Sequence, residues 1–143
     1  MNVARRPALE SDTAFARQVH HLAYRDVVEP QFGAWVEADQ DGYFEGDWQP
    51  AGIDIVLCNG VPAGYTCIED REDDIHIHEL VIHPNYQDMS VGSAILREAI
   101  ARGHRRRVPV RIATFHQNRA ADFYRRLGFQ EIGRSETHIN LEL

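Results

Sequence analysis

The chain has 143 residues, of which 43% are hydrophobic and 26% are charged, so global disorder is excluded and one domain with a packed core is expected. The formal net charge of −7 argues against nucleic acid or an anionic membrane as the main partner and mildly favours a cationic one. No apolar run is long enough to span a membrane, and the N-terminus lacks the apolar centre of a signal peptide. We therefore expect a single cytoplasmic domain over residues 1–143, in which Cys58 and Cys67 are reduced thiols outside any metal motif.

The first part of the chain is predicted to form a short edge strand followed by a helix. Residues 2–6 read as the strand, and Pro7 closes it because proline cannot donate to a strand ladder. Ser11 or Asp12 can cap a helix over residues 13–26, since a side-chain oxygen there accepts a bond from a free helical N–H. The apolar face of this helix holds Phe15, Val19, Leu22 and Ala23.

Residues 24–50 combine six aromatic residues with seven acidic residues and one basic residue. A second helix is predicted over residues 32–43, after a break at Pro30. Two interpretations are open: an amphipathic helix with a solvated acidic face, or a wall of an acceptor pocket whose aromatic rings and carboxylates bind a cationic amine. On the second interpretation the substrate-binding residues are Tyr24, Phe32 and Trp35.

The middle of the chain is predicted to be a hairpin and then a strand-loop-helix unit. Strands over residues 53–58 and 63–69 are joined by an Asn-Gly turn, which is a strong hairpin signal. A strand over residues 75–82 leads into a short polar loop and a helix that begins at Val91, with Ser90 as its expected N-cap. The first turn of a helix has free N–H groups and partial positive charge, so this unit suits a phosphate, although many such units bind nothing.

The last third of the chain continues the alternation of helix and strand. The basic residues 102–107 are expected to end the central helix, where they face the negative end of its dipole, and a weaker second reading is attraction of an anionic ligand. Asn118 leads a helix over residues 119–127, which ends at Gly128. Strands are predicted over residues 110–115, 129–133 and 138–141.

The run HPNYQDMSVGSAIL, residues 83–96, resembles the acetyl-CoA motif of the GNAT family of N-acetyltransferases. The family pattern is Gln or Arg, two residues, Gly, one residue, then Gly or Ala, and Gln87, Ser90 and Gly92 fill these places. The resemblance implies that main-chain N–H groups of residues 88–93 hold the CoA pyrophosphate while the preceding strand pairs with the pantetheine arm. The implied contacts are Leu80, Val81, Ile82, Gln87, Asp88, Met89, Ser90, Val91, Gly92 and Ser93.

Two positions depart from the family pattern. Position 90 is usually Gly, and Ser is strained there if the site needs a positive φ. Asp88 adds a carboxylate to a loop that is usually basic or Gly-rich, and it repels a pyrophosphate unless it points away. These departures leave open a rival class, a non-catalytic CoA-binding or regulatory module.

The run NRAADFYRRLGF, residues 118–129, resembles the second GNAT signature. By this match Asn118 contacts the pantetheine arm, with Gln117 as its rival, and Tyr124 stands near the sulfur as a general acid. The opening of the chain also matches the family, at Arg6, Pro7, Ala8 and Asp12.

Together these resemblances imply an α/β GNAT fold, with a mixed, mostly antiparallel sheet and helices on both faces. CoA is expected to enter where the strands over residues 75–82 and 110–115 splay apart. The implied reaction is acetyl transfer from acetyl-CoA to an amine nitrogen of a small acceptor, by direct attack in a ternary complex and without a metal. Acetylation of a protein N-terminus or lysine and a covalent route through Cys67 are the alternatives, and a homodimer is left open.

An alkylamine arrives mostly as an ammonium ion, so the transfer needs a base, and the central strand offers His76, His78 and Glu79. The two His residues are two apart and should share a face. The pair is similar to the His-x-His of the serotonin N-acetyltransferases in this family. We expect His78 to be the nearer base and His76 to pass the proton to solvent, or else both merely balance nearby acids. Glu79 should face the other way unless a bulge re-aims it.

Overall fold

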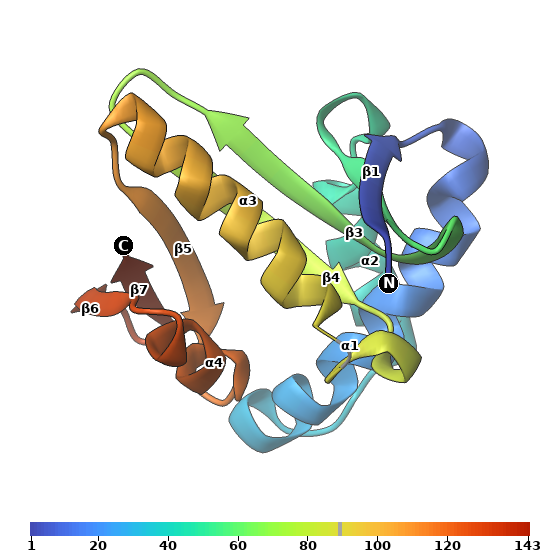
Figure 1. Ribbon diagram of the computed structural model, residues 1–143. Coiled ribbons are helices and arrows are strands. Elements are labelled where there is room, and N and C mark those ends of the chain that lie inside the picture. The colour runs from blue at the N-terminus through green and yellow to red at the C-terminus, as the bar shows by residue number, and fades with distance from the viewer. Residues whose placement is uncertain (89) are drawn as a thin grey trace.

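The computed structural model describes residues 1–88 and 90–143, so the expected cofactor contact of Met89 lies outside the described residues. The elements follow the predicted order (Figure 1). The strands are β1 (Val3–Pro7), β2 (Asp54–Cys58), β3 (Val61–Asp70), β4 (Ile75–Ile82), β5 (Val110–Phe115), β6 (Gln130–Arg134) and β7 (His138–Glu142). The α-helices are α1 (Thr13–Phe32), α2 (Glu37–Asp47), α3 (Val91–Arg106) and α4 (Ala120–Arg126). Across the two described ranges, no helix combines the length and apolarity that a bilayer span requires.

The strands form one sheet in the order β1-β2-β3-β4-β5-β7-β6. β4 and β5 run parallel, while the other neighbouring strands that the structure describes are antiparallel, which confirms the mixed, mostly antiparallel sheet. The parallel pairing of β4 with β5 is short. It begins with Ile75 opposite Val110 and ends with Ile77 opposite Ile112. The second half of β4 therefore keeps β3 as a ladder partner but has no described strand on its β5 side.

Helices cover both faces of the sheet, as the α/β pattern predicts. On one face, α3 and α4 bury Leu96, Ala99 and Ala121 against β4 and β5. On the other face, α1 and α2 bury Val19 and Phe44 against β2 and β3. Figure 1 shows α3 in front of the sheet and α2 behind it. Burial on both faces explains the three consecutive apolar residues Leu80, Val81 and Ile82 at the end of β4.

The helix boundaries around Pro30 differ from the prediction. α1 does not end at residue 26 but continues through Pro30 to Phe32, and α2 begins at Glu37 rather than at residue 32. Pro30 is tolerated because it lies in the last turn, where its missing N–H costs one helical bond and its ring has little helix left to disrupt. The break falls instead at Gly33, whose φ of 98° few other residues adopt.

Candidate active site

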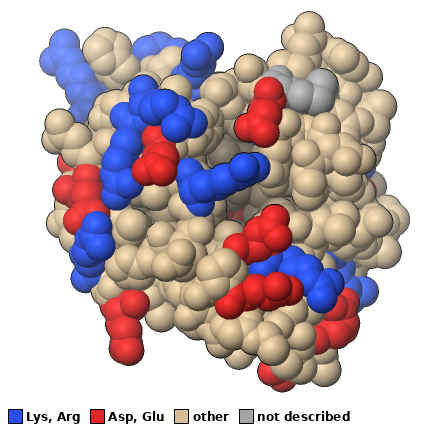
Figure 2. All heavy atoms as spheres, turned by 90° about the horizontal axis from the view of Figure 1, so that it is seen from below, with Lys and Arg blue, Asp and Glu red and all other residues tan. Residues whose placement is uncertain are grey.

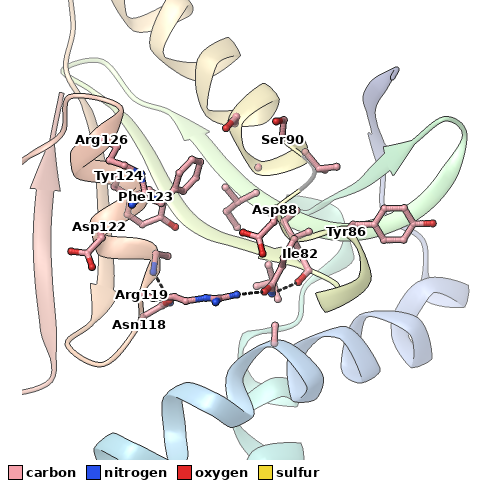
Figure 3. A pocket seen from close by; sticks show the side chains of 18 of the residues that line it. Ile82, Tyr86, Asp88, Ser90, Asn118, Arg119, Asp122, Phe123, Tyr124 and Arg126 are labelled. Atoms are coloured by element: carbon pink, nitrogen blue, oxygen red, sulfur yellow. Dashed lines mark hydrogen bonds between the residues drawn. The ribbon is translucent and has the colours of Figure 1, made fainter.

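A cavity of about 570 Å³ lies beside the second half of β4, where β5 no longer pairs with it. Its walls come from α1, β4, the loop before α3, the first turn of α3, and α4 with the loop before it (Figure 3). Figure 2 shows that the corresponding end of the molecule is hollowed near its centre, with basic and acidic side chains around the hollow. The lining residues are Ala23, Tyr24, Leu80, Val81, Ile82, Tyr86, Gln87, Asp88, Ser90, Val91, Gly92, Ser93, Asn118, Arg119, Ala120, Asp122, Phe123, Tyr124 and Arg126.

The N-terminus of α3 forms one end of the cavity. Ser90 occupies the N-cap position, as predicted, but its φ of 65° is left-handed and its hydroxyl makes no capping hydrogen bond. The expected hydroxyl cap is therefore wrong, because a capping side chain reaches the helix N–H groups from an extended backbone. The family pattern usually has Gly at this position. Ser90 adopts the left-handed backbone conformation that Gly adopts freely, at a cost of about 1 kcal/mol. The uncapped N–H groups of Gly92 and Ser93 remain available to an anion.

The loop before α3 carries one carboxylate and one amide into the same end. Asp88 lines the cavity in a left-handed conformation with a φ of 64°, and Figure 3 shows it beside Ile82. The Gln87 amide donates to the Ile82 carbonyl at 2.9 Å and accepts from the Arg119 guanidinium at 3.3 Å (Figure 3). Arg119 thereby links the loop before α4 to the loop before α3 and places a cation near Asp88.

The free edge of β4 and Asn118 form the middle of the cavity. Leu80, Val81 and Ile82 pair with β3 on one side, and their other edge faces the cavity. An extended ligand can pair with such an edge as an added strand does. Asn118 also lines the cavity, and its side-chain oxygen accepts the N–H of Ala120 at 2.9 Å, which leaves its NH₂ group for a ligand. Its rival Gln117 is exposed and does not line the cavity.

Tyr124 projects from α4 into the cavity with only 5% of its surface exposed. Its ring packs on Phe123 and Phe129 at centroid distances of 5.7 and 6.0 Å. Burial raises the pKa of the Tyr124 hydroxyl well above its usual value, so it stays protonated near neutral pH. No residue in the described ranges hydrogen-bonds this hydroxyl, which leaves a buried proton donor facing the cavity.

A β-bulge in β4 decides which way Glu79 points. Glu79 pairs with Cys67, but Ile77 pairs with Ile68, so His78 is an extra residue without a partner on β3. The extra residue brings Glu79 to the face of the sheet that α1 and α2 cover, beside Tyr24 and Tyr65, whose pKa values are raised by burial and then by the charge of Glu79. Burial, and then the charge of Asp47, raise the pKa of Glu79 to about 7. Among the described residues its carboxylate has no hydrogen-bond or ion-pair partner, so it is free to accept a proton.

His76 and His78 lie together, as their spacing predicts, with ring centroids 4.4 Å apart. His78 Nε2 is 2.8 Å from Glu69 Oε1, and this hydrogen bond holds the pKa of Glu69 below its usual value. Burial, and then the charge of His78, lower the pKa of His76. Neither ring lines the cavity, and His78 is paired with the exposed acid Glu69.

The structure separates the three expected substrate-binding residues. Tyr24 is half-buried and lines the cavity. Phe32 is 52% exposed and meets the ring of Phe115 edge to face at 5.4 Å. Trp35 lies on the outer side of α1, 5.3 Å from the ring of His21. The acidic segment is therefore divided between the cavity and the opposite surface of the same helix.

Cys67 is half-buried and does not line the cavity. Burial, and then the charge of Glu79, raise the pKa of its thiol, which disfavours the thiolate that a covalent route needs.

Several residues that shape the site escape sequence reasoning. Arg119, Arg126 and Ala23 line the cavity, and Asp47 raises the pKa of Glu79. Arg119 directly follows Asn118 in the second signature, which is a local signal. The proximity of Asp47 to Glu79 has no counterpart in the sequence, because it depends on how the end of α2 meets the sheet.

Comparison with protein families matches residues 16–129 to the model of the acetyltransferase (GNAT) family. A relative from Methanocaldococcus jannaschii, named "Uncharacterized N-acetyltransferase MJ1207", is 32% identical over 100 residues. That region covers 67% of this chain but 42% of the relative, so the chain matches less than half of the relative's length.

Solved structures show the same fold at low sequence identity. YjaB from Escherichia coli, in its apo form, has a TM-score of 0.79 at 18% identity and covers 99% of this chain and 97% of its own. The PaiA N-acetyltransferase of Thermoplasma acidophilum, solved in complex with coenzyme A, has a TM-score of 0.77 at 14% identity and covers 99% and 98%. The ribosomal-protein-S18-alanine N-acetyltransferase of Escherichia coli has a TM-score of 0.66 at 18% identity and covers 99% and 93%. The fold predicted from the signatures is confirmed.

Proposed function

This chain belongs to the acetyltransferase (GNAT) family, and from that premise we propose that it transfers an acetyl group from acetyl-CoA to an amine nitrogen of a small acceptor. The observation that carries the proposal is one cavity in which the free edge of β4, the N-terminus of α3 and the hydroxyl of Tyr124 come together. These three features match the parts of acyl-CoA in order along its length. The pyrophosphate needs an anion-binding end, the pantetheine arm needs a free strand edge, and the thioester needs a proton donor.

The cofactor spans the cavity from α3 to α4. Its pyrophosphate binds the N–H groups at the start of α3, with Arg119 supplying a further positive charge. Its pantetheine arm pairs with Leu80, Val81 and Ile82 and takes a hydrogen bond from Asn118. The thioester then lies beside Tyr124, where β4 and β5 part.

The reaction proceeds by direct attack in a ternary complex. A base first takes a proton from the ammonium form of the acceptor, and the neutral nitrogen attacks the thioester carbonyl. The tetrahedral intermediate collapses, the C–S bond breaks, and the departing CoA thiolate takes a proton from the Tyr124 hydroxyl. The nitrogen's remaining surplus proton restores the Tyr124 hydroxyl and the base releases its proton to solvent, so the products are an amide, CoA thiol and one proton.

Glu79 is the better-supported base, ahead of the His76–His78 pair. Its carboxylate is half-buried, has no ion-pair partner in the described chain, and has a pKa raised to about 7, which is the ideal range for a general base. His78 is engaged by Glu69, and neither ring nor Glu79 is itself part of the cavity lining, but Glu79 lies close enough to the cavity-lining Tyr24 for its charge to raise the pKa of that residue. The half-buried carboxylate of Glu79 and the exposed carboxylate of Asp47 nearby also favour a cationic acceptor.

A thiol-release assay with acetyl-CoA and a panel of small amines, polyamines, amino acids and basic peptides tests this proposal. Turnover with a small amine is expected, and turnover confined to peptides would replace the acceptor class with a protein N-terminus or lysine. Calorimetric binding of acetyl-CoA with no turnover across the panel would support the rival non-catalytic module, for which Asp88 in the phosphate-binding loop is the specific observation. An acetyl-Cys67 adduct formed from acetyl-CoA alone would overturn direct attack.

A further inference from the structure

Three metal-ligating side chains meet on the outer surface of α1 and α2, outside the lining of the cavity. His21 of α1 lies beside Glu37 and Asp41 of α2, and the three residues form what is here called the α1–α2 cluster. His21 Nε2 is 2.7 Å from Asp41 Oδ1 and 3.7 Å from Glu37 Oε1, and one ligand atom from each residue lies within 4.8 Å of the others. A surface hollow of about 390 Å³ is lined by His21, Glu37 and the Trp35 ring.

The fold holds these side chains in place from two directions. Glu37 and Asp41 are four residues apart, so they share one face of α2, and that face is turned toward α1 by the bend at Gly33. Trp35 Nε1 donates to Glu37 Oε2 at 2.7 Å, which leaves the Oε1 atom of Glu37 directed at His21.

The His21 ring is fixed at its other nitrogen. Its Nδ1 lies 2.9 Å from Nδ1 of His20, so one of the two rings donates to the other. When His21 carries its proton on Nδ1, Nε2 presents a lone pair to the cluster. A metal-ligating histidine usually has such a partner on its second nitrogen, which sets the tautomer.

We propose that the α1–α2 cluster binds a divalent transition-metal ion of the zinc type, through His21 Nε2 and one carboxylate oxygen each from Glu37 and Asp41. One imidazole and two carboxylates suit Zn²⁺, whose bonds of about 2.0–2.2 Å place neighbouring ligand atoms roughly 3.3–3.5 Å apart. The two distances from His21 Nε2 bracket this spacing. Water completes the coordination, because 66% of the Glu37 side chain and 40% of the Asp41 side chain are exposed.

One cation competes for the cluster. Arg17 Nε lies 3.9 Å from Asp41 Oδ1, but the same guanidinium also contacts Glu45 at 3.5 Å. Arg17 therefore keeps a carboxylate partner when the metal takes Asp41. The ion would join α2 to the middle of α1, so its expected effect is a more stable helix pair.

Trp35 serves as a built-in reporter of the site, since its ring is 5.3 Å from that of His21 and its N–H bonds Glu37. Titration of the full chain with ZnCl₂ should change the tryptophan fluorescence with a stoichiometry of one, and Trp35→Phe should abolish the change. With zinc at about 100 times its dissociation constant, the melting temperature should rise by at least about 5 °C. MgCl₂ should do neither, because Mg²⁺ does not favour imidazole.

Substitution tests the ligands one at a time. His21→Gln, Glu37→Gln and Asp41→Asn should each weaken zinc binding at least tenfold, whereas Asp39→Asn, an exposed carboxylate on the same helix but outside the cluster, should leave it unchanged. Zinc absorption spectra should show nitrogen and oxygen ligands without sulfur, which separates the cluster from the two cysteines. Failure of zinc to bind, or equal binding by wild type, His21→Gln and Asp41→Asn, would overturn the proposal. None of these readouts depends on acetyl transfer.

Discussion

Glu79 lies directly opposite Cys67 in the β3–β4 ladder, at the place where an unbroken ladder would put His78. Residues that face each other across antiparallel strands point to the same side of the sheet, so Glu79 shares the side of Cys67 and Tyr65, under α1 and α2. One inserted residue thus half-buries the carboxylate and puts it near Asp47. The raised pKa of Glu79 follows from this placement.

The first prediction is that Glu79→Gln lowers kcat/KM about 100-fold at pH 8, because the amide cannot take the acceptor's proton. For the wild type, kcat/KM should fall tenfold per pH unit below about pH 7, where Glu79 becomes protonated, and level off above it. The measurement is thiol release from pH 5 to 9. Glu69→Gln, at an exposed carboxylate, is the matched control. Loss of the acidic limb in the His76→Gln, His78→Gln double variant, but not in Glu79→Gln, would assign the base to the histidines.

Glu79 should also make the free energy of unfolding depend on pH. Its pKa in the folded protein is raised to about 7 from an ordinary value of 4.5, so its stabilising contribution is complete below pH 4.5 and disappears as pH rises through 7. When the pH is raised from 5 to 8, the free energy of unfolding of the wild type should therefore fall by about 2 kcal/mol more than that of Glu79→Gln. Urea denaturation of both proteins at the two pH values measures the difference. Equal losses would show that Glu79 is not desolvated in the folded protein.

Tyr124→Phe should lower kcat about 100-fold, while the melting temperature and the dissociation constant of CoA change little. The ring keeps its packing on Phe123 and Phe129, and only the proton donor is lost. Because burial raises the pKa of Tyr124, the wild-type rate should not decline through loss of this proton up to about pH 10. Tyr86→Phe, a second cavity-lining tyrosine, serves as the control. An unchanged kcat, with chemistry shown to be rate-limiting, would remove Tyr124 from the mechanism.

Asp88→Asn should tighten CoA binding about fivefold at low salt, because a cavity-lining carboxylate repels a pyrophosphate by about 1 kcal/mol in a solvated site. The gain should shrink as salt is raised, since screening weakens the same repulsion. Calorimetry with CoA measures it, and pantetheine, which has no pyrophosphate, is the control ligand. An equal gain for both ligands would point to a change in the loop rather than to charge.

Local patterns in the sequence predict most of the elements and much of the cavity. The order of strand, loop and helix around Gln87, Ser90 and Gly92 is correct, and Asn118 and Tyr124 of the second signature both line the cavity. These features depend on short-range physics: alternation within a strand, periodicity along a helix, and the free N–H groups at a helix start. The left-handed backbone at Ser90 could also be anticipated, because the family pattern usually has Gly at this position.

The tertiary structure alone decides the features that depend on pairing between distant segments. The register of β3 against β4 creates the bulge at His78 and thereby buries Glu79, and alternation within β4 by itself assigns that carboxylate to the opposite face. The bend at Gly33, rather than at Pro30, folds α2 onto the outer side of α1, so Trp35 leaves the cavity and joins His21 there. In each case one residue, His78 or Gly33, decides on which side Glu79 or Trp35 lies. Only packing against the rest of the chain selects between the two sides.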